Sequence, residues 1–384
     1  MAEPKVYNIP AHGSFADRLA VGLLRGEPWG AGQAAQMELA RTLILLPNRR
    51  AIRTLRDAFV RAAGGALLLP RMVALGDLED DDIVPGALDE LDGDALPVVS
   101  PLERTMRLMP LVERWQARTG QKRAKVETLR FAEALGQTLD LLQRHDIAPS
   151  DLHDIVADDL AEQWKRTTEF LAIVLDAWPG ILTQYGLSDG AATRQSLVKS
   201  LTNRWRESSP RHPVLAAGIA DAEAARAKLL GVIARMPRGA IVLPGLDMSM
   251  SEGVWDDLGR ADPHPQVPLK ELLEGMSIAR PEVRNWPVEA ETDGPPSRDM
   301  LLSTAFAPPD ETAEWRAVAL PETVQTGLRF AELRSPAGEA MAISLTLRQA
   351  LDEPGRTAAL VTPDRDLARR VAAQMRRWKI DVDD

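Results

Sequence analysis

The chain has 384 residues, a formal net charge of −10, 45% hydrophobic residues and 27% charged residues. This length and balance are ordinary for a globular protein of two or three domains. The absence of cysteine excludes disulfides, thiolate metal sites and cysteine nucleophiles, so we expect a reducing, cytoplasmic location. The first residues lack the basic and apolar regions of a signal peptide, and no apolar run approaches the length of a membrane span.

The first hundred residues favour a fold in which strands and helices alternate. We expect a strand at 5–10, a helix at 16–24 and a second strand at 41–47. The continuous apolar run of the second strand is typical of a strand buried on both faces of a parallel sheet. Asn48 is well placed to cap the helix that follows. Together these elements predict an α/β domain.

The helix after Asn48 carries two stripes at helical spacing. The apolar stripe is formed by Ile52, Leu55 and Phe59, and the basic stripe by Arg49, Arg53 and Arg56, with Arg50 beside it. Net acidity argues against general coating of nucleic acid, but a local basic groove is compatible with it. Two interpretations stay open: the arginines bind a polyanion, or they form a solvated face paired with the acidic segment 76–94. We expect that segment to be a loop and not a metal site, because its carboxylates show no converging spacing.

Residues 101–206 predict a helical block. Amphipathic patterns occur at 101–120, 126–146, 159–178 and 193–207. In the third pattern, Trp164 and Trp178 fall at helical spacing with Leu171 and Leu175. We expect these side chains to pack in a core, and a base-stacking platform is the alternative.

Strand patterns return after the helical block. Strands are expected at 212–220 and 239–247, on either side of a helix at 221–237, so the block interrupts an α/β domain that resumes afterwards. Residues 260–325 are rich in proline, glycine and acids and predict loop and linker. The last segment predicts strand, helix, strand and helix at 328–334, 338–352, 357–364 and 365–378.

The last strand–helix junction is similar to the one that begins at Pro47. In order, Pro47, Asn48, Arg49 and Arg53 correspond to Pro363, Asp364, Arg365 and Arg369. Either ordinary helix-start chemistry produces this similarity by chance, or the chain contains two related α/β lobes. In open parallel sheets, ligands bind beyond the carboxyl ends of the strands, where helix N-termini and arginines suit phosphate. This arrangement predicts that the arginines face a groove and that the strands at 5–10 and 41–47 lie close together in the sheet.

The turn after the first strand lacks the chemistry of a phosphate loop. The pattern GxxxxGK[ST] occurs nowhere in the chain, and Pro10, His12, Gly13 and Ser14 stand in its place without a lysine. We expect a structural turn in which Ser14 caps the next helix and His12 is polar surface. Asp247 ends an apolar strand at the place of a Walker-B acid, without a second acid beside it; alternatively it caps the following helix. The sequence predicts no catalytic residue and no metal site.

Several phrases carry a family resemblance. LILLPNRRAIRTLRDAF resembles motif Ia of superfamily 1 helicases, and AALVTPDRDLARRVAAQM resembles the opening of their second motor lobe. With VYNIPAHGSF, LLPRMVALGD, GAIVLPGLD and HPQVPLKELLEGM, they resemble the B subunits of alphaproteobacterial AddAB helicase–nucleases over nearly the whole chain.

The resemblance implies a RecA-like parallel-sheet lobe with a mostly helical insertion, followed by the start of a second α/β lobe. The expected divisions are 1–100 and 207–290 for the first lobe, 101–206 for the insertion, 291–327 for a linker and 328–384 for a truncated second lobe. It also implies a part in processing DNA double-strand breaks for homologous recombination. In this family the partner AddA is the ATP-driven motor, and a nuclease domain without counterpart in this chain cuts DNA, so we expect a non-catalytic fragment.

The resemblance places the contacts to a DNA backbone at Asn48, Arg49, Arg50, Arg53, Arg365 and Arg369. No cofactor is expected in the chain: the missing lysine puts ATP binding in doubt, and Mg²⁺ would belong to the full complex. Two alternatives stay open, an ATPase with a divergent phosphate loop and a pure interaction module that docks AddA through the helical block. A Rossmann-type nucleotide binder is disfavoured, because no GxGxxG follows a strand.

Overall fold

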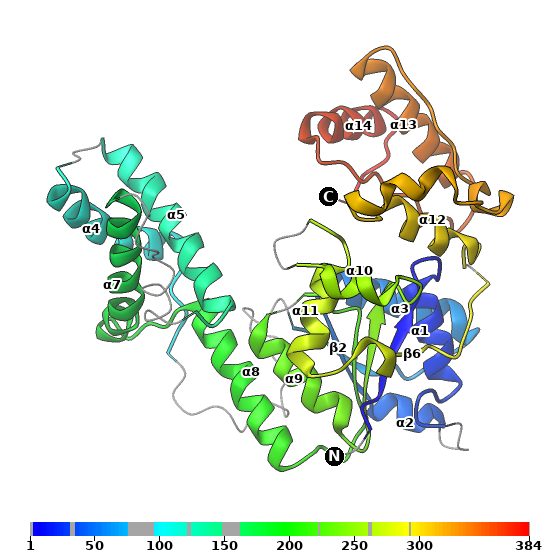
Figure 1. The fold of residues 1–384 in the computed structure, drawn as a ribbon, viewed down its shortest axis with the longest axis horizontal. Helices are drawn as coiled ribbons and strands as arrows, with labels where there is room; N and C mark the ends of the chain where they lie inside the picture. Colours follow the sequence, from blue (N-terminus) through cyan, green and yellow to red (C-terminus); the bar gives the residue numbers. More distant parts are fainter. Residues whose placement is uncertain are drawn as a thin grey trace. The chain divides into compact units, whose positions relative to one another are not determined.

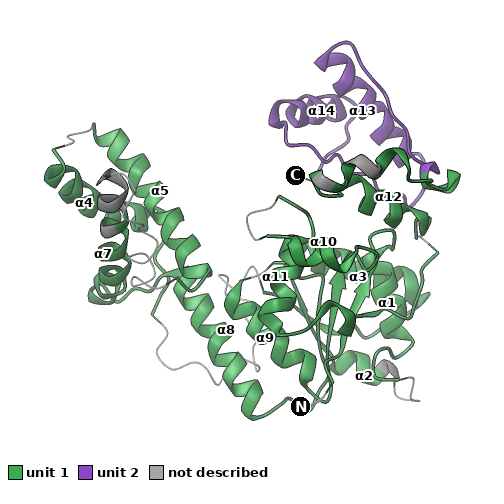
Figure 2. Ribbon diagram, viewed as in Figure 1, with its two compact units in different colours: residues 1–324 green, residues 325–384 purple. Residues whose placement is uncertain are grey.

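The computed structural model describes residues 3–30, 35–75, 96–120, 124–147, 162–221, 223–259, 263–291 and 293–383. The acidic segment 76–94, for which a loop was predicted, lies outside them. The chain folds into two units, one of residues 1–324 and one of residues 325–384 (Figure 2). The second unit therefore begins beside residue 328, where a second lobe was expected.

Within the described residues, the first unit contains a six-stranded parallel sheet in the order β3-β2-β4-β5-β1-β6 (Figure 1). The strands are β1 Val6–Ile9, β2 Leu43–Leu46, β3 Arg71–Ala74, β4 Val214–Ala217, β5 Gly239–Pro244 and β6 Arg284–Asn285. The α/β fold predicted from the sequence is confirmed. The central strands β4 and β5 come from the part of the chain that follows the helical block, so the block does interrupt one sheet domain.

Alternate residues of each central strand enter different cores, as the two-residue period of a strand requires. Val214 and Ala216 of β4 pack in one core, while Leu215 and Ala217 pack in the other. The first core receives helices α9 (Ala224–Arg235) and α11 (Val267–Met276). The second receives α1 (Phe15–Leu24), α2 (Ala35–Arg41) and α3 (Arg49–Ala63). Both faces of the sheet are covered by helices, which explains its continuous apolar strands.

The helical block has a core of its own. The block consists of α4 Pro101–Arg118, α5 Lys125–Arg144, α7 Glu162–Gln184 and α8 Gly190–Glu207. Its own core is built from α4, α5 and α7, whereas α8 packs through Val198, Leu201 and Trp205 in the first core of the sheet. Trp178 is fully buried in the core of the block and donates its Nε1–H to Asp189 Oδ2 at 2.7 Å. The core interpretation is therefore confirmed for Trp178, whereas the side chain of Trp164 lies outside the described residues. In the part of the chain that the structure describes, no helix has the length and apolarity to cross a membrane.

The prediction that residues 260–325 form only loop and linker is wrong. This stretch contains α11, β6 and α12 (Ser297–Ala305), and it belongs to the first unit up to residue 324. Two prolines of this stretch stand at helix starts: Pro268 lies in the first turn of α11, and Pro296 directly precedes α12. Proline is tolerated there because the first helical N–H groups need no partner within the helix.

The second unit forms two predicted helices but neither predicted strand. Its helices α13 (Pro336–Leu351) and α14 (Arg365–Arg377) pack through Ala340, Val371 and Met375. Residues 328–334 and 357–364 have no strand pairing, and Phe330 and Val361 are each 93% exposed. Two apolar stretches beside one helix pair do not make a stable sheet without further strands to cover them.

Candidate functional site

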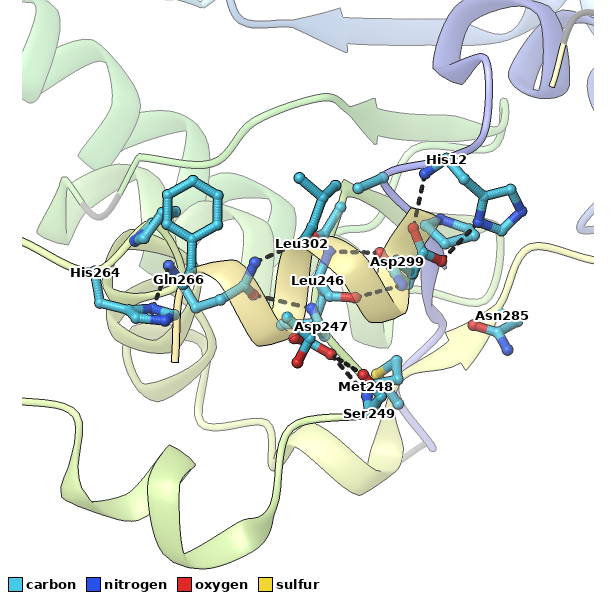
Figure 3. Close-up of a pocket in the computed structure, with 17 residues that line it drawn as sticks. His12, Leu246, Asp247, Met248, Ser249, His264, Gln266, Asn285, Asp299 and Leu302 are labelled. Carbon is cyan, nitrogen blue, oxygen red and sulfur yellow. Dashed lines mark hydrogen bonds and ion pairs between the residues drawn. The ribbon is translucent and has the colours of Figure 1, made fainter. Parts of the chain in front are cut away.

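The carboxyl ends of β1 and β5, two neighbouring strands, border a cavity of about 360 Å³. Its lining includes Pro10 and His12 after β1, Asp247 after β5, and Asp299 and Leu302 of α12 (Figure 3). This is the edge at which open parallel sheets bind ligands. Of the predicted degenerate phosphate loop, Pro10 and His12 line this cavity together with Asp247, whereas Gly13 and Ser14 do not.

A carboxylate of the chain occupies the N-terminus of α1, where a nucleotide phosphate would be held. Asp293 accepts hydrogen bonds from the Ser14 backbone N–H and from Arg18 Nε, each at 2.7 Å. The Ala290 N–H is a third donor, at 2.8 Å. Asp293 and Arg18 are only 12% and 6% exposed. Burial raises the pKa of Asp293, but these hydrogen bonds and the Arg18 charge outweigh it and bring the pKa below its ordinary value.

His12 is held by a second carboxylate. Its backbone N–H donates to Asp299 Oδ1 at 2.8 Å, and its ring Nδ1 lies 2.6 Å from Asp299 Oδ2. The other ring nitrogen, Nε2, lies 3.0 Å from the Arg18 guanidinium. A proton on Nδ1 lets Nε2 accept from Arg18, which satisfies all three groups with a neutral imidazole. The expectation that His12 is plain polar surface is wrong, because its side chain is 10% exposed and fully engaged.

Side chains and backbone of the chain itself pack against the loop after β1. A Cβ at Gly13 would lie 2.8 Å from Arg18 Nε, so the guanidinium covers the glycine. The Gly294 N–H donates to the His12 carbonyl at 2.9 Å, which fastens the segment around Asp293 across the loop. Ser14 precedes α1, but its side chain makes no capping hydrogen bond to the helix backbone. Its hydroxyl instead donates to Asp17, so the capping prediction is wrong. These residues do not fit bound ATP.

Asp247 closes a turn and does not cap a helix. Its Oδ1 accepts from the N–H and the hydroxyl of Ser249 and from the Met250 N–H, while Ser251 caps the next helix, α10 (Glu252–Asp257). Burial raises the pKa of Asp247, but hydrogen bonds from Ser249, Ser303 and Met250 outweigh it and lower the pKa overall. The capping alternative is therefore wrong, and the carboxylate is already committed to local donors.

A buried asparagine fixes the two strands that border the cavity. Asn8 is 1% exposed; its amide donates to the Leu246 carbonyl, and its side-chain oxygen accepts from the Leu246 N–H, each at 2.9 Å. This pair of hydrogen bonds joins β1 to the turn that follows β5. Gln266 extends the bracing, since it accepts from the Asp247 N–H at 3.0 Å and donates to the Gly245 carbonyl at 2.9 Å. These four hydrogen bonds brace the edge of the sheet that forms one wall of the cavity.

The arginines of α3 lie at the same edge of the sheet, but not at this cavity. Asn48 caps α3 as predicted, accepting from the Ala51 N–H at 2.9 Å. Arg49, Arg50 and Arg53 are exposed, and the described residues that line the cavity do not include them. The expectation that the first two strands lie close together is wrong, because β4 and β5 separate β2 from β1. β2, β4 and β5 are all apolar and buried, so their patterns alone do not set the order of the strands.

The corresponding arginines of the second unit also follow a capped helix start. Asp364 caps α14 by accepting from the N–H groups of Asp366 and Leu367. Arg365 and Arg369 are exposed at the start of that helix, and Arg369 forms an ion pair with Asp366. The similarity of the two junctions therefore extends to their caps, but only the first follows a strand.

Sequence reasoning missed Arg18, Asp293 and Asp299. The carboxylates lie in a proline- and glycine-rich stretch, and Asp293 meets Ser14 across 279 positions of the chain. No local pattern reports such a pairing. Arg18 offered a weak signal, since it lies one helical turn after Ser14 and so on the side of α1 that faces the loop.

The parallel sheet covered by helices on both faces defines an α/β protein, with an architecture consistent with a RecA-like lobe. The chain matches no protein-family model and no curated protein.

Proposed function

We propose that this protein is a helicase-like module without ATPase activity that binds single-stranded DNA in the processing of double-strand breaks. The observation that carries the proposal is the carboxylate of Asp293 at the N-terminus of α1, hydrogen-bonded to Ser14 and Arg18. In this proposal a carboxylate of the chain takes the place of a nucleotide phosphate. The lobe then keeps the architecture of a nucleotide-driven motor but does not bind ATP. The resemblance to AddAB B subunits supports the cytoplasmic DNA-repair role and a motor partner of the AddA type.

The strand-binding surface in this proposal is the start of α3. Arg49, Arg50 and Arg53 are exposed at the carboxyl edge of the sheet. Guanidinium groups form paired hydrogen bonds with phosphate oxygens, and free N–H groups at a helix start add to the attraction. The contacts hold a strand by its backbone and carry no sequence information. ATP and Mg²⁺ would be handled by the motor partner.

The proposal is tested by fluorescence anisotropy with a labelled oligothymidine across a salt series. The double variant Arg49→Ala/Arg53→Ala should bind more weakly and lower the salt slope by about 1.4, the value for two lost contacts to a single strand. Arg206→Ala/Arg284→Ala is the matched control, since both side chains are exposed, Arg206 lies in the last turn of α8, and Arg284 lies in β6 at the other end of the strand order from β2. Equal binding by wild type and the α3 variant would contradict the assigned surface. In a parallel thermal melt, Mg-ATP should leave the melting temperature unchanged.

A second candidate function is docking of a protein partner through the helical block alone. One observation favours it: Leu102 and Met106 lie one turn apart on α4 and are 72% and 57% exposed. Exposed apolar side chains on one helix face are typical of a contact surface. Partner capture lost in Leu102→Ser/Met106→Ser, without measurable affinity of the chain for DNA, would support this function over the first.

A further inference from the structure

A second cavity, of about 630 Å³, lies at the amino edge of the sheet, at the opposite ends of the strands from the site above. Leu43 and Arg71, the first residues of β2 and β3, line it. The last turns of α2 and α8 and the loop 208–212, which leads into β4, complete the wall. Elements from both the early and the late part of the chain therefore build it.

The described lining of this cavity is cationic and includes no carboxylate. Its charged members are Arg41, Arg71, Arg204 and Arg211, with His212 beside them. The hydroxyls of Ser208 and Ser209 add neutral donors. The chain as a whole has a net charge of −10, so the local charge of this cavity is opposite in sign to the charge of the protein. Like charges gathered in one hollow repel one another and favour the uptake of an anion.

Helix ends alone do not account for this cluster. Arg41 and Arg204 lie in the last turns of α2 and α8, where a cation interacts favourably with the helix dipole. Arg71 and Arg211 have no such role, because Arg71 opens a strand and Arg211 lies in the loop before β4. The helix dipole therefore accounts for the positions of only two of the four guanidinium groups.

The pKa of His212 reflects the positive charge around it. Burial lowers the pKa of His212, and the positive charge of Arg71 lowers it further. The imidazole is thus pushed toward its neutral form, in which it can still donate one hydrogen bond. An anion bound between the two side chains would cancel the effect of Arg71 on the His212 pKa.

We propose that this cavity binds linked phosphate groups, as found in a free polyphosphate or in the backbone of a nucleic-acid strand. Several guanidinium forks around one hollow suit phosphate oxygens, with which each fork can form two hydrogen bonds. Trp205 lines the cavity but is only 6% exposed, so it presents no ring face for a base to stack on. Recognition therefore rests on phosphates and not on bases. The volume lies within the range of small-molecule sites.

The test is calorimetric titration of the full chain with inorganic tripolyphosphate at low salt, and with a ten-residue oligothymidine. Arg41→Ala and Arg211→Ala should each weaken tripolyphosphate binding by about tenfold, the loss expected for a charged hydrogen bond. Arg206→Ala is the matched control, because Arg206 is exposed in the same last turn of α8 but does not line the cavity. Thermal melts of each variant show whether it is folded.

The two phosphate sources are distinguished by competition. Displacement of tripolyphosphate by oligothymidine identifies a nucleic-acid strand as the ligand, and binding of tripolyphosphate alone identifies a free polyphosphate. Tripolyphosphate binding that Arg41→Ala and Arg211→Ala weaken and Arg206→Ala leaves unchanged assigns the anion to this cavity, whatever the outcome for the strand-binding surface on α3. Absence of tripolyphosphate binding by wild type, or equal binding by the cavity variants, overturns it.

A measurement on the unaltered chain guards against misfolded variants. The His212 ring signals, assigned by their loss in His212→Gln, are followed by NMR over a pH series with and without tripolyphosphate. The His212 pKa should rise when the anion is bound, because an anion favours the imidazolium. A His212 pKa that tripolyphosphate leaves unchanged would also overturn the proposal.

Discussion

Asp293 accepts the backbone N–H of Ser14 at 2.7 Å, so a carboxylate of the chain itself lies at the N-terminus of α1, a position that favours anions. The same carboxylate binds Arg18, whose guanidinium also reaches His12. One residue therefore closes the loop after β1, neutralises a buried cation and orients a histidine. The consequences for stability can be measured.

Replacement of Asp293 by alanine should lower the free energy of unfolding by about 3 kcal/mol, because it leaves the buried Arg18 guanidinium without its anionic partner. Asp293→Asn keeps an acceptor for the Ser14 N–H but removes the charge, so its loss should be smaller. Urea unfolding followed by circular dichroism measures both. Equal stability of Asp293→Ala and wild type would show that the loop is not held by this contact.

The lowered pKa of Asp247 predicts an acid-sensitive turn. A carboxyl whose folded pKa is below its unfolded value stabilises the protein above the unfolded pKa. That contribution is lost as pH falls below the ordinary value of 3.8 through the folded pKa. Asp247→Asn, which cannot titrate, should therefore be less stable than wild type at pH 7 and lose less stability between pH 5 and pH 3. Melting temperatures over that pH range test this, and parallel curves for the two proteins would contradict it.

Gly22 allows Trp286 to pack against α1. A Cβ at Gly22 would lie 2.5 Å from the Trp286 ring, whose Nε1–H donates to the Arg18 carbonyl at 3.0 Å. Gly22→Ala should therefore cost about 1–3 kcal/mol through overpacking. The control is Gly180→Ala in α7, where nothing lies within 4 Å and alanine should stabilise the helix by about 0.5–1 kcal/mol. Chemical denaturation of both variants should give changes of opposite sign; a neutral Gly22→Ala would argue against close packing here.

The core of the helical block depends on Asp189. This residue is 6% exposed, caps α8 through the Ala191 N–H, accepts from Trp178 and pairs with Arg104 at 3.0 Å. Asp189→Ala should destabilise the block by about 1–3 kcal/mol, since it leaves the buried indole N–H of Trp178 without an acceptor. Arg104 keeps its ion pair with Asp140 at 2.7 Å. Asp189→Asn retains the cap and should lose less. Hydrogen exchange resolves the block from the sheet: faster exchange confined to 101–207 is expected, and unchanged exchange there would refute the role.

Local patterns in the chain were enough to predict most elements of the first unit. The apolar run at 41–47 became β2, Asn48 caps α3, and Leu55 and Phe59 are buried as the helical spacing indicates. These features depend on residues within one or two turns of each other, so a linear pattern contains them. The same local logic failed for 328–334 and 357–364, where apolar stretches remain without strand partners.

Folding decided the order of the strands and the content of the site. β4 and β5 separate β2 from β1. The sequence did not predict this order, because β2, β4 and β5 are all apolar and buried on both faces. The contact of Asp293 with Ser14 joins residues 279 positions apart, and the basic cavity gathers Arg41, Arg71 and Arg211 from three separate segments. A sequence pattern describes neighbours along the chain, whereas a site is made of neighbours in space. Only burial of the two sheet faces brought these charges together.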